Sequence, residues 1–329
     1  MDLQDLAALA HLWPDLAKEA IHLRLTSLLG SRHLDAEQFL EKMAETNSVV
    51  SGSGALEIIL PGTCTPRDLD IYTPSNEGRT LVTYLEANNF ESYKYEGTPI
   101  DRRKEEQEDD HEHYDNRNGI KAVHRLRHAV YGSQIHIIES VSLSPLVPLF
   151  FFHSTQVMNF VSATAAVCFY PELTFRRKGE NSPSTTGVYT HTTYSGLMNF
   201  AWPGSDFKNL DAVQKYRARG FEIYDHCTKL HSHTGLCSIV DPYPRESCST
   251  IHRRTDDAFV LKLPHFSTYA ATTIRPGVAW RLGSRMYEAK GVEHRYDAIV
   301  TVAADNKPMQ YSNTEETDHI IHHPESTAM

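Results

Sequence analysis

Residues 49–72 constrain the fold more than any other part of the chain. Two valines lead into a Ser-Gly-Ser-Gly turn at residues 51–54, and a short, mostly apolar run at residues 55–60 follows before a Pro-Gly pair ends it. An acid–apolar–acid–apolar pattern then begins at Asp68. Because glycine permits a tight turn and proline interrupts a helix, these residues predict a strand, a turn, a short helix, a loop and a second strand.

The predicted turn and second strand carry the chemistry. A turn that opens a helix presents unpaired backbone N–H groups and the positive end of the helix dipole, which together favour a phosphate group. Side chains alternate along a strand, so Asp68 and Asp70 should share one face while Leu69 and Ile71 point into the core. Two adjacent carboxylates repel each other unless a cation lies between them, and magnesium prefers oxygen ligands of this kind.

These residues resemble the nucleotidyltransferase superfamily related to DNA polymerase beta. Its signature is a Gly-Ser turn, a short helix, and then an acid–apolar–acid strand. Gly52 and Ser53 match the turn, and the Asp-Leu-Asp sequence at residues 68–70 matches the strand, with a slightly longer gap than usual between them. Residues 46–53, 68–74 and 152–160 also resemble a group of uncharacterised nucleotidyltransferase-like proteins of mushroom-forming fungi.

The resemblance implies an α/β (α+β) fold, with a small mixed sheet of the nucleotidyltransferase type flanked by helices and followed by a C-terminal extension. The implied activity transfers a nucleoside monophosphate from a nucleoside triphosphate to a hydroxyl acceptor, which the sequence does not distinguish among protein, RNA and small molecules. Gly52 and Ser53 would hold the triphosphate. Asp68 and Asp70 would bind one or two divalent cations, Mg²⁺ or Mn²⁺.

The superfamily places a third carboxylate on a later strand, and here the chain departs from the pattern. The best-matching position is His136, between two isoleucines, and the nearest acid is Glu139. The two are three residues apart, so a regular strand turns only one of them toward the Asp pair. We expect His136 there, and Glu139 as a metal ligand only through a bulge. Histidine suits softer metals such as manganese or zinc, so the alternative is a catalytically degenerate protein that serves as a binding or regulatory module. His136 would otherwise be a hydrogen-bonded core residue.

Periodicity and capping signals predict the remaining elements. Two helices should occupy residues 2–30, divided at Pro14, and Asp35 should cap a helix that runs through Glu45. Further expectations are a helix at 77–89, a hairpin at 120–139, a buried helix at 146–161, a basic helix at 210–220 and a final strand at 258–263. In a helix, the adjacent His153 and Ser154 would not face each other, which favours a structural role over a catalytic pair.

The predicted organisation has four parts: N-terminal helices at 1–34, the nucleotidyltransferase-like domain at 35–175, a C-terminal region packed on it at 176–304, and a disordered tail at 305–329. The formal net charge is −10, and residues 101–119 and 305–329 each contribute a net −4. The chain therefore lacks the basic field that drives general nucleic-acid binding.

The remaining composition predicts location and metal content. No segment is long and apolar enough to span a membrane, and the N-terminus is acidic rather than signal-like. Five unevenly spaced cysteines favour a reducing, intracellular compartment. Histidines and cysteines gather at residues 226–252 but form no Cys-x-x-Cys pair, so ordinary loop residues are favoured there over a structural zinc site.

Overall fold

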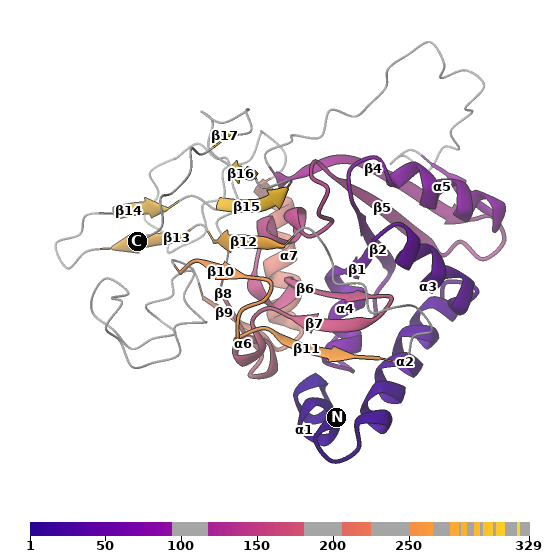
Figure 1. The fold of residues 1–329 in the computed structure, drawn as a ribbon, viewed down its shortest axis with the longest axis horizontal. Coiled ribbons are helices and arrows are strands. Elements are labelled where there is room, and N and C mark those ends of the chain that lie inside the picture. Colours follow the sequence, from indigo (N-terminus) through magenta and orange to yellow (C-terminus); the bar gives the residue numbers. More distant parts are fainter. Residues whose placement is uncertain are drawn as a thin grey trace, which may run out of the picture. The chain divides into compact units, whose positions relative to one another are not determined.

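The computed structural model describes residues 1–93, 118–180, 206–224, 251–265, 277–282, 284–287, 293–296, 299–304, 307–312 and 321–322. It divides the chain into two compact units (Figure 1). The first unit comprises residues 1–146, 159–167 and 262–275, and the second comprises residues 147–158, 168–261 and 276–329. The chain thus passes between the units several times. The expected mixed α/β class is confirmed.

The first unit is built on an eight-stranded mixed sheet with the strand order β11-β7-β6-β1-β2-β5-β4-β3. In chain order the strands are β1 (Val49–Ser51), β2 (Asp68–Thr73), β3 (Phe90–Ser92), β4 (Ile120–His128), β5 (Gln134–Ser140), β6 (Asn159–Ser162), β7 (Ala165–Cys168) and β11 (Leu261–Pro264). Strands β2 and β5 run parallel, whereas β1 is antiparallel to both β2 and β6. The predicted hairpin is confirmed, because β4 pairs antiparallel with β5.

Five helices belong to the same unit: α1 (Leu3–Ala10), α2 (Pro14–Gly30), α3 (Ala36–Glu45), α4 (Gly52–Ile59) and α5 (Gly78–Ala87). Helices α2, α3 and α5 follow one another along one side of the unit (Figure 1). Two local signals worked as predicted: Pro14 begins α2, and the Asp35 side chain accepts a hydrogen bond from Gln38 N–H at the start of α3. Asn89 takes a left-handed conformation with φ of 64° after α5. No described helix is long and apolar enough to cross a membrane.

Residues 146–161 do not form the predicted buried helix. They form two short 3₁₀ segments, η3 (Val147–Phe151) and η4 (Thr155–Val157), and then enter β6. Strand β6 instead pairs with the edge of β1 that β2 leaves free, with Val161 opposite Val50. Every residue of β6 is buried, so the sequence shows neither a helical nor an alternating pattern there.

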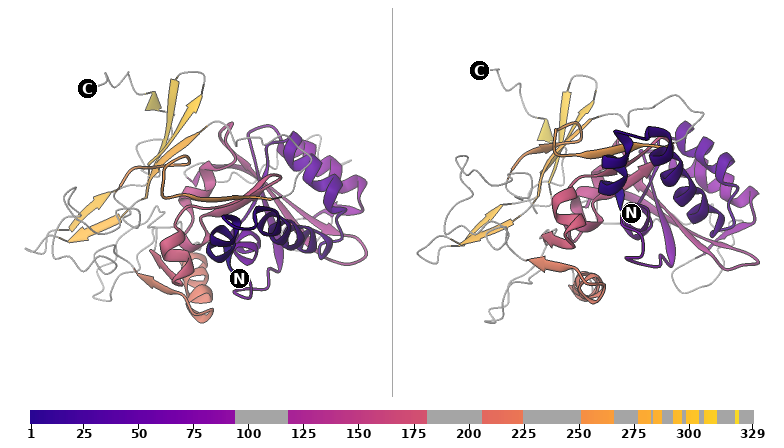
Figure 2. Two further views of the ribbon diagram at one scale, coloured as in Figure 1. Left: turned by 60° about the horizontal axis from the view of Figure 1, so that its bottom comes forward. Right: turned by 90° about the horizontal axis from the view of Figure 1, so that it is seen from below.

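The second unit contains a five-stranded sheet with the order β10-β12-β15-β16-β17. Its elements, seen from two further directions in Figure 2, are α6 (Pro171–Phe175), α7 (Asp206–Ala218), β8 (Lys178–Glu180), β9 (Glu222–Tyr224), β10 (Arg253–Arg254), β12 (Val278–Arg281), β13 (Ser284–Tyr287), β14 (Glu293–Tyr296), β15 (Ile299–Ala304), β16 (Lys307–Ser312) and β17 (Ile321–His322). The Trp280 ring stacks on Phe150 at 4.1 Å between centroids and meets Phe169 edge-on at 5.0 Å. Arg253 is also buried in this unit and pairs with Asp257.

Two sequence expectations for the C-terminal half need correction. The strand predicted at 258–263 is β11, and it is not the final one, because β12 to β17 follow. The expected disordered tail contains β16 and β17, since β15 offers β16 a complete antiparallel partner. The acidic stretch at 101–117, residues 181–195, and the histidines and cysteines at 226–248 lie outside the described residues.

Candidate functional site

The two aspartates of β2 share one face of the sheet, as the alternation predicts. Leu69 and Ile71 are fully buried, while the side chains of Asp68 and Asp70 are 38% and 27% exposed. Strand β5 runs parallel to β2 and places His136 directly opposite Asp70. Because opposite residues of paired strands point to the same face, register alone brings the imidazole to the carboxylates.

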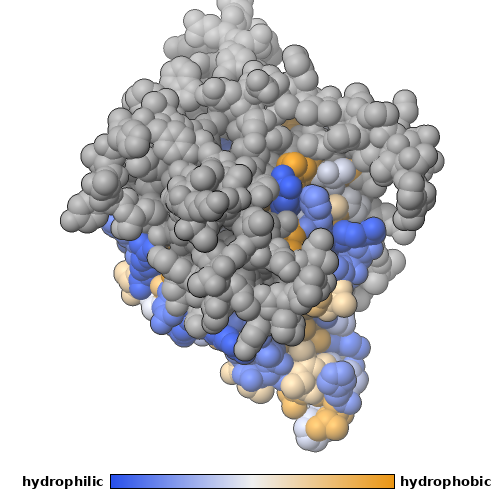
Figure 3. All heavy atoms as spheres, turned by 90° about the vertical axis from the view of Figure 1, so that its left-hand side faces the viewer, coloured by the Kyte–Doolittle hydropathy of each residue, from blue (hydrophilic) through white to orange (hydrophobic). Residues whose placement is uncertain are grey.

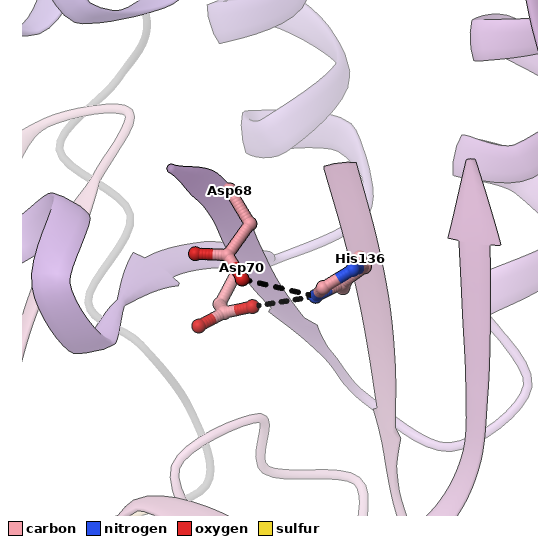
Figure 4. Close-up of side chains that lie close together, drawn as sticks. All are labelled: Asp68, Asp70 and His136. Atoms are coloured by element: carbon pink, nitrogen blue, oxygen red, sulfur yellow. Dashed lines mark hydrogen bonds and ion pairs between the residues drawn. The ribbon is translucent and has the colours of Figure 1, made fainter. Parts of the chain in front are cut away.

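The three side chains form a compact group (Figure 4). His136 Nδ1 lies 3.0 Å from Asp70 Oδ1 and 3.9 Å from Asp68 Oδ2. One ligand atom from each residue can be chosen so that all lie within 4.8 Å of one another, which is a spacing suited to a shared cation. This group of Asp68, Asp70 and His136 could therefore hold a metal ion.

The electrostatics of His136 follow from its position. Burial disfavours its charged form, but the hydrogen bond to Asp70 and the negative charges of Asp70 and Asp68 outweigh burial and raise its pKa above the ordinary histidine value. The nearby Arg125 opposes that rise. The imidazolium form thus supplies part of the positive charge that the carboxylate pair requires, and a metal ion would have to take its place.

The glycine turn meets the aspartate pair. Ser51 at the end of β1 is directly opposite Asp70 in the antiparallel register, and Gly52 begins α4 with φ of 64°. A Cβ atom added to Gly52 would lie 3.1 Å from Asp70 Oδ2, so the turn passes immediately beside that carboxylate. Ser53, the second turn residue, is 8% exposed.

The N-terminus of α4 has no side-chain cap from Ser51. That hydroxyl instead donates to the Asn159 carbonyl of β6 at 2.5 Å, and no side-chain cap hydrogen bond is made to the helix. The N-cap side chain therefore does not occupy the first N–H groups of α4, and a helix start of this kind can receive an anion.

Glu139 does not belong to this group, which corrects its assignment as a possible metal ligand. Strand β5 is regular from Gln134 to Glu139 against β2, so Glu139 pairs with Thr73 and points to the opposite face from His136. There its Oε1 accepts hydrogen bonds from Asn76 N–H at 2.7 Å and from Lys121 Nζ at 2.6 Å. Burial opposes ionisation, but the neighbouring His124, Lys121 and Asn76 N–H prevail and lower its pKa to about 2.

Two contacts near the turn and in the second unit were not predicted. Cys64 Sγ donates to the Ser53 carbonyl at 3.3 Å. The path of the loop at residues 60–67 creates this contact, and no sequence pattern predicts it. His153 Nδ1 and Ser154 Oγ lie 2.6 Å apart, because this segment is not the helix that would have separated them. Ser154 is fully buried, and burial together with the Lys215 charge lowers the pKa of His153 to about 4, which fits a neutral structural pair.

Comparison of the chain with protein-family models, with curated proteins and with solved structures gives no match.

Proposed function

We propose that this chain is a metal-dependent nucleotidyltransferase, which moves a nucleoside monophosphate from a nucleoside triphosphate to a hydroxyl acceptor. The observation that supports this proposal best is the contact between the Gly52 turn and Asp70. A helix start suited to a phosphate group and a pair of possible metal ligands thus lie at one place, as metal-assisted phosphoryl transfer requires.

In the proposed site, the backbone at Gly52 and Ser53 holds the triphosphate, and Asp68 and Asp70 hold the metal together with the neutral form of His136. The donor set fits Mn²⁺ better than Mg²⁺, because imidazole is a softer ligand than a carboxylate oxygen. A bound divalent ion would neutralise the developing phosphate charge. A substrate hydroxyl forms a bond to the α-phosphorus while the bond to the bridging oxygen breaks, pyrophosphate leaves with that electron pair, and the hydroxyl proton passes to solvent.

The first test is incubation of the protein with nucleoside triphosphates labelled at the α-phosphate, with MnCl₂ or MgCl₂ and a panel of hydroxyl acceptors. We expect metal-dependent nucleotide binding and pyrophosphate release, with release at least about 100-fold lower in Asp70→Asn. Glu41→Gln, which removes an exposed carboxylate from α3, is the matched control and should keep full activity. Absence of metal-dependent nucleotide binding in the unmodified protein would overturn the proposal.

A second candidate function is a binding or regulatory module that retains the site without its chemistry. The observation that favours it is His136 in the position opposite Asp70, where the superfamily pattern calls for a carboxylate. It predicts metal-dependent nucleotide binding that Asp70→Asn abolishes, with no pyrophosphate release in either metal.

A further inference from the structure

We call Asp68, Asp70 and His136 the metal group, because they could hold a metal ion. Charged side chains continue from this group in a row across the sheet. Arg125 of β4 is directly opposite His136, and Arg127 is directly opposite Gln134, which in turn is opposite Asp68. Since opposite residues share a face, both arginines lie on the face of Asp68 and Asp70. Arg125 is half-buried and Arg127 is exposed.

Tyr93 extends the row beyond β4. Its backbone N–H donates to the Arg125 carbonyl at 3.0 Å, and the guanidinium carbon of Arg127 lies 5.2 Å from the centroid of its ring. Burial raises the pKa of the Tyr93 hydroxyl, the charges of Arg127 and Arg125 oppose that rise, and the charge of Asp68 adds to it. The ring therefore lies beside the Arg127 guanidinium, at the end of the row away from β2. We call Tyr93, Arg125 and Arg127 the arginine flank.

The arginine flank and the helix start lie on opposite sides of Asp70. Strand β1, which leads into α4, borders β2 on one side, while β5 and then β4 border it on the other. In phosphoryl transfer the attacking and leaving oxygens are roughly in line. If the departing pyrophosphate is held at Gly52, the attacking hydroxyl must approach from the side of β5 and β4.

We propose, on the basis of the proposed function, that the arginine flank binds the acceptor, and that this acceptor is a small hydroxyl compound carrying a phosphate group. A guanidinium fork matches the geometry of phosphate oxygens and binds them in a bidentate manner. Two arginines suit one phosphate group. A nucleic-acid polyanion needs many more cationic contacts, and the chain carries a formal net charge of −10.

A purely structural role for the arginines makes a different prediction. If they only balanced Asp68 and Asp70, their removal would weaken the metal group and leave phosphate binding elsewhere unchanged. The two roles are separated by measuring the binding of a phosphate compound and of a metal–nucleotide pair in the same variants.

The experiment uses the full chain and glycerol 3-phosphate as the probe, with binding followed by NMR titration, and glycerol as the phosphate-free comparison. The variants are Arg125→Gln/Arg127→Gln, Gly52→Ala, and Arg79→Gln, which removes an exposed arginine from α5 as the matched control. We expect the double variant to weaken probe binding at least about tenfold, whereas Gly52→Ala and Arg79→Gln should leave it within about twofold. Circular dichroism and thermal melting establish that each variant is folded.

The outcomes distinguish this inference from the proposed function. MnATP binding that is roughly tenfold weaker in Gly52→Ala, with glycerol 3-phosphate binding retained, supports both. No MnATP binding in the unmodified chain overturns the proposed function, while probe binding that depends on the two arginines still supports an anion site on this flank. Equal probe binding by the unmodified chain and the double variant overturns the inference. So does arginine-dependent binding of a ten-nucleotide single strand without binding of glycerol 3-phosphate.

Discussion

Strand β5 presents one titratable side chain to each face of the sheet, and the two have opposite surroundings. On one face, Glu139 is 6% exposed and receives hydrogen bonds from a lysine and a backbone N–H. On the other, within the described part of the chain, Asp68 and Asp70 share the single Nδ1 atom of His136. The first arrangement satisfies its charge internally, whereas the second leaves two carboxylates with one proton donor between them.

This contrast separates a carboxylate that stabilises the fold from a pair of carboxylates that could accept a cation. A buried carboxylate with several donors is a structural group, and its removal leaves those donors unsatisfied. A half-exposed pair of like charges is unfavourable by itself and gains from an added cation. Proteins tolerate such local cost where function requires it. On the face drawn in Figure 3, the coloured residues mix hydrophilic and hydrophobic areas.

The largest effect on stability is expected at Glu139. Glu139→Ala removes the acceptor of Asn76 N–H and Lys121 Nζ beside the start of α5, and we expect the free energy of unfolding to fall by about 2–3 kcal/mol. Urea denaturation followed by circular dichroism measures this change. Asp70→Ala is the comparison on the other face and should cost less than about 1 kcal/mol, because it also relieves repulsion with Asp68. If the free energy of unfolding fell equally in the two variants, the acids on the two faces would contribute equally to stability, contrary to this prediction.

A smaller loss is expected when the turn is changed. Gly52→Ala places a Cβ 3.1 Å from Asp70 Oδ2 at a residue with φ of 64°, so we expect about 1 kcal/mol of destabilisation and roughly tenfold weaker nucleotide binding in Mn²⁺. Gly62→Ala is a matched control, because Gly62 also has positive φ, at 77°, but an added Cβ there would contact nothing within 4 Å. It should share the destabilisation and keep nucleotide binding. Similar binding losses in both variants would attribute the effect to backbone strain alone.

The pH dependence of stability should separate the faces further. The pKa of Glu139 is lowered from 4.5 to about 2 in the folded chain, so its stabilising contribution is present above pH 4.5 and is lost as the pH falls toward 2. Thermal melting between pH 6 and pH 2 should therefore show a weaker acid dependence in Glu139→Gln than in the unmodified chain. Identical acid profiles would show that Lys121 and Asn76 do not hold the carboxylate ionised.

Local signals in the sequence predicted the parts of the site that depend on neighbouring residues. Glycine, proline and alternation located the turn, α4 and the Asp68–Asp70 face, because each acts within a few residues. The same reasoning failed for the helix expected at 146–161, where the fully buried strand β6 shows no period and its pairing with β1 decides the conformation. The hydrogen bonds of Glu139 could not be predicted either, because its partners, Asn76 N–H and the Lys121 amine, are distant in the sequence.

The smallest expected effect concerns the metal preference of the site. His136→Asp places a third carboxylate opposite Asp70, so without metal we expect a lower melting temperature through added repulsion among like charges. With Mg²⁺ bound, we expect His136→Asp to melt at a higher temperature than the unmodified chain. Three oxygen ligands bind Mg²⁺ better than a set that includes imidazole. The ratio of Mn²⁺ to Mg²⁺ affinity, measured by calorimetric titration, should therefore fall roughly threefold. His136→Asn, which adds no charge, is the control. It should weaken the binding of both metals without making Mg²⁺ the better bound of the two. An unchanged ratio in His136→Asp would mean that His136 does not contact the metal, and the site would then depend on the aspartate pair alone.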